Sequence, residues 1–195
     1  MTTTEEPLPL RERKKLRTRQ ALAETAVAMF TERGFDSTTL DELVEAVEVS
    51  KRTFFRNFAS KEDVATTAVK QLWDTVLEVV AERPSPRLDG LKDALLTAID
   101  RMDDYWYRQF LPAVRLVETH PALQGYSLRY CTGIQEEMVR LLPGEPTLER
   151  RLLVEIAVGA WHVALAEWSP SGDRERLPVL VERAFAAIPA VVSLE

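Results

Sequence analysis

The chain has 195 residues, of which 46% are hydrophobic and 29% charged, and its formal net charge is −6 at pH 7. This length and composition suit one large globular domain or two small ones, each with a hydrophobic core. No apolar run is long enough to span a membrane, and the single cysteine, Cys131, excludes an internal disulfide. Met1–Pro9 is polar and acidic, so we expect no secretory signal and a cytoplasmic protein.

The charge is unevenly distributed along the chain. Residues 1–61 carry 11 Lys and Arg against 10 Asp and Glu, whereas residues 62–195 carry 14 against 21. The N-terminal part also contains a dense basic run, formed by Arg11, Arg13, Lys14, Lys15, Arg17 and Arg19. Such a run either reaches a DNA phosphate or minor groove, or serves as a solubilising tail, and the sequence leaves both interpretations open.

The first predicted helix covers about Arg11–Arg33 and ends at Gly34, with a buried stripe of Leu16, Ala23, Val27 and Phe30. A short helix follows, for which Thr39 and Glu42 form a capping box. Its buried stripe contains Leu40, Leu43, Val44 and Val47. About two turns of helix are too few to be stable alone, so this helix must pack on its neighbours.

Ser50 is the predicted N-cap of the next helix, whose first turn contains Lys51, Arg52 and Thr53. Two cations at a helix N-terminus oppose the macrodipole, whereas a phosphate placed there would reverse the sign of the interaction. Val49, Phe54 and Phe58 are spaced to face the core, and the side chains expected to lie toward the outside or the rim are Ser50, Lys51, Arg52, Phe55, Arg56 and Asn57. Ser60 with Asp63 forms a third cap beside Lys61. This pattern predicts a helix-turn-helix that enters a DNA groove.

The remainder of the chain is predicted to be helical, and no segment has a strand pattern. The expected helices are a connecting helix over about 61–83, then Asp89–Asp104, Tyr105–Thr119 (interrupted or started by Pro112), Pro121–Leu142, Thr147–Trp168 and a last helix from Glu175 or Pro178 to Ile188. Small residues in the last two helices allow close approach. These two helices therefore fit a four-helix interface between two copies of the chain.

Aromatic side chains are concentrated in the C-terminal part, where they form either an ordinary core or the wall of a ligand pocket. The candidate ligand-binding residues are Trp73, Met102, Trp106, Phe110, Tyr126, Tyr130, Trp161 and His162. Arg108, Arg115 and Arg129 are candidates to meet an anionic group. Asp100, Asp103 and Asp104, beside Tyr105 and Trp106, would instead suit a cationic aromatic ligand.

No catalytic, cofactor or metal site is expected. His120 and His162 are the only histidines, and no carboxylate lies at the helical spacing to either that a metal site in a helical bundle needs. Cys131 has no neighbouring base, so a buried structural thiol is expected, with a redox switch as the alternative. Glycine-rich phosphate loops are absent from the sequence. We therefore do not expect an enzyme.

The segment from about Ala21 to Val64 resembles the N-terminal domain of TetR-family transcriptional regulators. The matching residues are Phe30, Gly34, Phe35, Thr39, Val49, Ser50, Thr53, Phe54, Phe58, Ser60 and Lys61. The resemblance implies an all-α homodimer, with a three-helix DNA-binding domain over 1–61 and a larger helical domain over 62–195 for ligand binding and dimerisation. It implies a repressor that a small molecule releases from a palindromic operator; activation remains an alternative. The alternative from another functional class is an all-α dimer that acts as a scaffold or binds a ligand but does not bind DNA.

The resemblance also assigns roles to individual residues. Thr39 would contact a phosphate, Ser50, Lys51, Arg52 and Thr53 would face bases and backbone, and Phe55, Asn57 and Lys61 would line the phosphate rim. The sequence departs from the family at two positions: Phe55 replaces a usual tyrosine, and Glu48 replaces a usual glycine. Glu48 would either adopt the positive φ of that turn at a cost of about 1 kcal/mol or indicate a slightly different turn. More loosely, Arg115–Met138 resembles part of actinobacterial regulators that sense acyl-CoA. The sequence does not identify the effector, the operator or the target genes. From the resemblance, the effector would be apolar or acyl-CoA-like.

Overall fold

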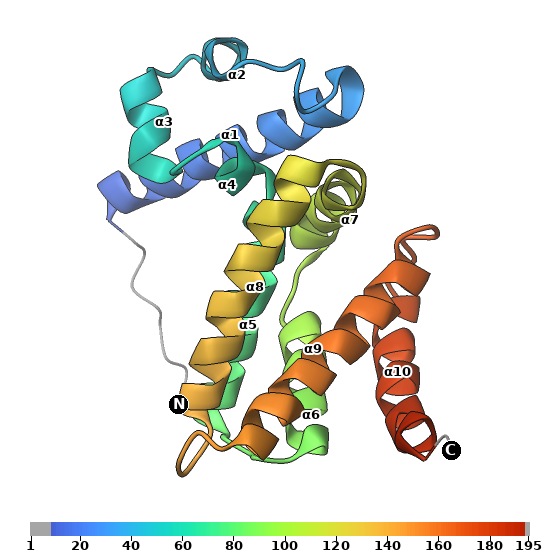
Figure 1. Cartoon of the computed structure of the whole chain (residues 1–195). Helices are drawn as coiled ribbons and strands as arrows, with labels where there is room; N and C mark the ends of the chain where they lie inside the picture. The colour runs from blue at the N-terminus through green and yellow to red at the C-terminus, as the bar shows by residue number, and fades with distance from the viewer. Residues whose placement is uncertain (1–8, 194–195) are drawn as a thin grey trace, which may run out of the picture. The chain divides into compact units, whose positions relative to one another are not determined.

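The computed structural model describes residues 9–193, which form ten α-helices and no strand (Figure 1). The helices are α1 Leu10–Arg33, α2 Leu40–Ala46, α3 Lys51–Asn57, α4 Lys61–Ala65, α5 Thr67–Glu82, α6 Leu88–Asp100, α7 Asp104–Thr119, α8 Pro121–Leu141, α9 Leu148–Trp168 and α10 Arg176–Val192. The expected all-α fold is confirmed. Residues 1–8 and 194–195 lie outside the described residues. The expectation of no secretory signal and the start of the first predicted domain both fall on residues 1–8.

The helices group into two compact units that divide between Thr67 and Ala68. The expected connecting helix is two helices, α4 and α5, separated at Thr66. The hydroxyl of Thr66 donates to the carbonyl of Glu62, at 2.9 Å, and such side chain-to-backbone bonds compete with regular helix geometry. No helix in the described part of the chain is long and apolar enough to cross a membrane.

In the first unit, α1 packs against α2 and α4, and α2 packs against α3. The core consists of apolar side chains on all four helices and the loops between them, the largest being Leu22, Phe30, Phe35, Leu43, Phe54, Phe58 and Val64. The expected stripe of α1 is wrong at Leu16, which is 47% exposed. The buried residues of α1 begin only at Leu22, so the N-terminal half of this helix projects beyond the core.

The turn between α2 and α3 places Glu48 in the left-handed backbone region, with φ of 55°. The N–H of Val49 donates to the carbonyl of Val44 at 2.9 Å, and that of Glu48 donates to Glu45 at 3.0 Å. These two bonds form a Schellman motif, in which the residue at positive φ is usually glycine. The positive φ expected at position 48 is therefore confirmed, and a side chain with a Cβ occupies a conformation that costs about 1 kcal/mol.

Replacing Glu48 with glycine is expected to raise the free energy of unfolding of the first unit by about 0.5–1 kcal/mol, because glycine adopts this φ without a Cβ clash. Denaturant unfolding monitored by circular dichroism measures the change. The matched control is Glu48→Ala, which removes the charge but keeps the Cβ. A gain as large in the alanine variant would contradict the conformational explanation.

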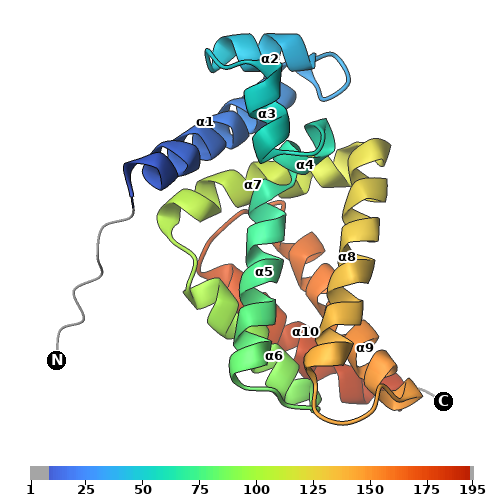
Figure 2. The same cartoon turned by 90° about the vertical axis from the view of Figure 1, so that its left-hand side faces the viewer.

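In the second unit, α9 and α10 pack side by side (Figure 1), and α6 packs against both. Figure 2 shows α5 running beside α8. Trp106 stacks on Phe110 with ring centroids 4.1 Å apart, and its indole Nε1 donates to the carbonyl of Ala68 at 2.8 Å. The helix α7 continues through Pro112, so the proposed interruption or start at this residue is wrong. α6 ends at Asp100 rather than Asp104, because Asp103 caps α7 by accepting from the amide of Trp106 at 2.7 Å.

Candidate functional site

The first turn of α3 carries two exposed cations at a capped helix N-terminus. The hydroxyl of Ser50 accepts a hydrogen bond from the amide of Thr53 at 3.1 Å, which confirms the predicted cap. Lys51 pairs with Asp41 on α2 at 2.7 Å, although both side chains are more than half exposed. Arg52 has neither an ion pair nor a hydrogen bond to another side chain described in the structure. The helix N-terminus therefore presents a guanidinium that has no side-chain partner among residues 9–193.

Thr39 lies at the start of α2, and its capping box is confirmed. Its hydroxyl accepts from the amide of Glu42 at 3.2 Å, while the Glu42 carboxylate accepts from the amide of Thr39 at 2.7 Å. The bond from the Thr39 amide, followed by that from its hydroxyl, lowers the pKa of Glu42. Thr39 is exposed, so its position at the helix start is available to a phosphate.

In the last turn of α3, some of the residues predicted to contact DNA face solvent and another is buried. Phe55 is 57% exposed and Arg56 is also exposed. Asn57, which we expected to face outward, is only 8% exposed. Its side-chain amide donates to the carbonyl of Thr53 at 2.7 Å, and its own carbonyl accepts from Arg19 at 2.6 Å. Asn57 thus holds the end of α3 against α1.

Lys61 does not extend freely into solvent. Its ammonium donates to the carbonyls of Phe35 at 2.5 Å and Thr38 at 2.9 Å, and it lies 4.2 Å from the centroid of the Phe35 ring. These contacts join the start of α4 to the loop between α1 and α2. The structure therefore gives Lys61 a structural role in the first unit.

The N-terminal basic run is helical from Leu10 onward and divides between two environments. Arg19 packs over the Phe58 ring, with its guanidinium carbon 4.6 Å from the centroid. Arg11, Lys14 and Lys15 line a shallow groove on α1 together with Arg56 of α3; Leu10, Glu12 and Thr18 complete its wall. The groove thus joins cations from two helices on one surface.

The second unit contains a cavity of about 390 Å³ whose wall is built from α5, α7, α8 and α9. Its lining residues are Val69, Trp73, Val114, Val117, Glu118, Gln124, Ser127, Leu128, Cys131, Trp161, His162, Leu165 and Ala166. Three of the eight candidate ligand-binding residues are therefore brought together here: Trp73, Trp161 and His162. The rings of Trp73 and Trp161 meet edge to face with centroids 6.1 Å apart.

The other five candidates lie elsewhere. Met102, Trp106 and Phe110 are 5%, 1% and 0% exposed and belong to the closed core of the unit. Tyr126 and Tyr130 lie on α8 facing α5, where the ammonium of Lys70 is 5.9 Å and 5.3 Å from their ring centroids. The polar lining residues Glu118, Gln124 and Ser127 were not predicted, because nothing in the sequence distinguishes a single polar residue that faces a cavity from one that faces solvent.

Cys131 is 7% exposed, and burial raises the pKa of its thiol. The expected buried thiol is confirmed, although it lies on the cavity wall. The arginines considered for an anionic ligand do not line this cavity. Arg115 instead donates to the carbonyl of Ser169 at 2.9 Å. Within residues 9–193 we find no cluster of three or more His, Cys, Asp or Glu that could hold a metal ion.

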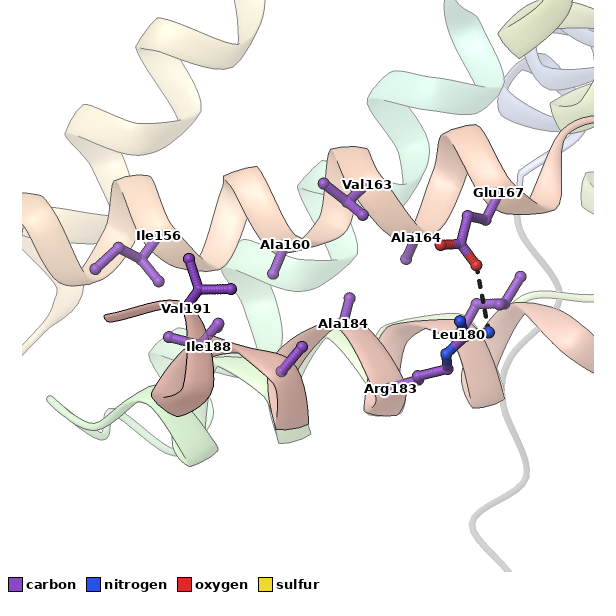
Figure 3. A pocket seen from close by; sticks show the side chains of 11 residues that line it. Ile156, Ala160, Val163, Ala164, Glu167, Leu180, Arg183, Ala184, Ile188 and Val191 are labelled. Atoms are coloured by element: carbon purple, nitrogen blue, oxygen red, sulfur yellow. Dashed lines mark ion pairs between the residues drawn. The ribbon is translucent and has the colours of Figure 1, made fainter. Parts of the chain in front are cut away.

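A second apolar depression of about 380 Å³ runs between α9 and α10 (Figure 3). Its lining residues are Ile156, Ala160, Val163, Ala164, Glu167, Leu180, Arg183, Ala184, Ala187, Ile188 and Val191. Ile156, Val163 and Val191 are 40%, 57% and 61% exposed, and Glu167 pairs with Arg183 at its edge. Large exposed apolar patches mark interaction surfaces.

Comparison with known proteins decides the family. Residues 22–67 match the profile of bacterial regulatory proteins, tetR family. The HTH-type transcriptional regulator TcmR of Streptomyces glaucescens is 30% identical over 194 residues, which cover 92% of this chain and 86% of that protein. The chain belongs to the TetR family. It is accordingly a DNA-binding transcriptional regulator and not an enzyme, as expected.

Other regulators resemble this chain in sequence or in fold. A putative mycofactocin biosynthesis transcriptional regulator of Mycobacterium tuberculosis, MftR, is 27% identical over 134 residues, covering 67% of this chain and 66% of that protein. A TetR-family regulator from Streptomyces coelicolor A3 has the same fold, with 21% identity, a TM-score of 0.54 and coverage of 98% of this chain and 100% of that one. TetR-family regulators bind operator DNA and act as dimers with small-molecule effectors.

Proposed function

We propose that this TetR-family regulator is a repressor, which binds a palindromic operator as a homodimer and is released by a small molecule bound in the α5–α9 cavity. The guanidinium of Arg52, which has no ion-pair partner in the described part of the chain and lies at the N-terminus of α3, carries the proposal. A cation at this end of a helix opposes the macrodipole, and a DNA phosphate or base acceptor there would reverse the sign of the interaction. Binding chromosomal DNA in a bacterium would place the protein in the cytoplasm.

In this proposal, the exposed residues of α2 and α3 form the direct DNA contact. Ser50, Lys51, Arg52 and Thr53 face base edges and backbone, and Thr39 meets a phosphate at the N-terminus of α2. Arg56, which shares the groove on α1, lies on the phosphate rim. Phe55 lacks the hydroxyl that would donate to a phosphate, so it would contact deoxyribose or a thymine methyl. Asn57 and Lys61 would act indirectly, because their polar groups already hold α3 and the α1–α2 loop in place.

The groove on α1 would extend the phosphate contact beyond α3. Replacing both Lys14 and Lys15 with glutamine is expected to lower the slope of log affinity against log salt by about 2–4, since four lysines of a dimer would no longer displace counterions. Titration of operator DNA at several salt concentrations measures the slope. The matched control is Arg13→Gln with Arg17→Gln, which removes the same charge outside the groove. Equal losses in both double variants would contradict a specific contact by the groove.

The α9–α10 surface would form the dimer interface, as a four-helix arrangement related by two-fold symmetry. Its alanines allow close helix approach, and its exposed valines and isoleucine would be buried by the second copy. Effector and operator would then be antagonistic by linkage: a ligand that binds the free state more tightly lowers operator affinity by the same factor.

Selection of binding sites from random duplex DNA with the purified protein tests the proposal. An enriched palindrome supports a symmetric dimeric repressor, and its overlap with a promoter whose transcription the protein lowers would separate repression from activation. Absence of enrichment, also after denaturation and refolding to remove any bound ligand, would favour the scaffolding alternative over DNA binding.

A further inference from the structure

The wall of the α5–α9 cavity carries one charged side chain among the residues that the structure describes, and that charge is negative. Glu118 of α7 contributes the carboxylate, and no lysine or arginine lines the space. Lys70 of α5 lies at the tyrosine rings of α8 instead, and Arg115 of α7 donates to the backbone carbonyls of Ser169 and Pro170. The cavity therefore offers no cationic partner to a bound anion.

The carboxylate of Glu118 has unused acceptor capacity. It accepts from the hydroxyl of Ser169 at 2.9 Å and 3.1 Å, and no ion pair joins it to any cation within the described range. Glu118 is exposed, and because an ionised carboxylate has about four lone-pair sites, the one hydroxyl donor leaves most of them to solvent. A cationic or hydrogen-bond-donating group on a ligand would replace that solvent.

His162 does not compensate the negative charge of Glu118. Desolvation lowers the pKa of its imidazole below the ordinary value, which favours the neutral ring. The side-chain amide of Gln124 donates to the backbone carbonyl of Glu118 at 2.9 Å rather than to its carboxylate. The polar groups of the wall thus leave the local charge negative.

The apolar part of the wall suits a flat aromatic ligand. The rings of Trp73 and Trp161 meet edge to face and line the cavity with a small exposed area, since they are 3% and 2% exposed. A tryptophan face attracts a cation by about 0.5–2 kcal/mol. The volume of about 390 Å³ falls at the small end of the range of about 300–1,000 Å³ for small-molecule pockets. An acyl-CoA carries several phosphate charges, which the negative sign of this cavity disfavours.

We propose that the effector is an aromatic molecule carrying a cationic or hydrogen-bond-donating group that meets Glu118, and that anionic ligands, including acyl-CoA, are rejected. The proposal rests on the proposed function, in which this cavity is the effector site. It replaces the acyl-CoA-like effector that the looser sequence resemblance implied.

Calorimetric titration with three probes of one ring and different charge tests the proposal: naphthylmethylamine, naphthylmethanol and naphthoate. We expect the amine to bind about tenfold more tightly than naphthoate, and this preference to fall below about threefold in Glu118→Gln. Glutamine keeps an acceptor for Ser169, so the fold is retained. Two controls should keep the preference: Glu118→Asp, which preserves the charge, and Asp93→Asn, which removes an exposed carboxylate of α6 outside the cavity.

Naphthoate binding as tight as the amine, a preference unaffected by Glu118→Gln, or no binding of any probe would each overturn the proposal. Release of operator DNA by the amine is measured separately. A charge preference that depends on Glu118 supports the proposed ligand class even if the amine does not release the operator. An operator that stays bound would count only against the proposed release mechanism.

Discussion

Replacing Arg52 with alanine is expected to weaken operator binding by about 2–6 kcal/mol while leaving the dimer intact. A side chain that contacts a base edge contributes about 1–3 kcal/mol, and a two-fold symmetric dimer loses the contact in both half-sites. Arg52 has no hydrogen bond or ion pair with a described side chain, so its removal should not affect folding. Fluorescence anisotropy with the selected operator measures the affinity, and sedimentation measures the dimer.

The control for this prediction is Arg87→Ala, because Arg87 is also exposed but lies before α6 in the second unit and makes no side-chain cap bond there. It removes the same charge without touching α3. If both variants bound operator as tightly as the unaltered protein, the proposed contact between the first turn of α3 and the bases would be wrong.

Replacing Val163 with lysine is expected to raise the dissociation constant of the dimer by at least about 100-fold. The proposed interface would bury the new ammonium, and Glu167, the one carboxylate that lines the depression, already pairs with Arg183. An uncompensated buried charge costs about 3–5 kcal/mol. The helix itself should remain stable, because Val163 is 57% exposed in the single chain and lysine is the better helix former. Operator affinity should fall in parallel, since one half-site contact alone holds the DNA weakly.

Analytical ultracentrifugation measures the dissociation constant, and circular dichroism confirms that the helices persist. Gln71→Lys adds the same charge to an exposed position of α5 and should leave the dimer unchanged. A Val163→Lys protein that remains dimeric at nanomolar concentration would exclude the α9–α10 surface as the interface.

The local features of the fold could be predicted because they depend on residues close in sequence. Thr39, Ser50 and Ser60 act on amides within three residues, so their caps are visible in the sequence and are present in the structure. The positive φ at Glu48 was expected only through the family resemblance, in which this position is usually glycine. The course of α7 through Pro112 differs, since packing of the second unit stabilises a helix that local propensity alone would break.

The candidate sites depend on distant residues, and here the sequence was less informative. Helical periodicity marks Trp106 and Trp161 alike as buried, yet one lies in the closed core and the other lines a cavity. Similarly, Lys61 reads as an exposed cation at a helix start, but carbonyls 23 and 26 residues earlier in the chain accept its hydrogen bonds. Periodicity reports burial, and only the three-dimensional packing separates a filled core from an open space.

The four tryptophans of the chain fall into an enclosed pair and a cavity-lining pair, so intrinsic fluorescence can report ligand binding. Trp106 and Trp168 are enclosed, and their indole N–H groups donate to the carbonyls of Ala68 and Asp173. Trp73 and Trp161 line the cavity in near-perpendicular orientation. A molecule entering the cavity would change the emission and the near-ultraviolet exciton signal of the second pair, while the first pair supplies a constant background. Unlabelled compound libraries can therefore be screened for the effector by intrinsic fluorescence alone.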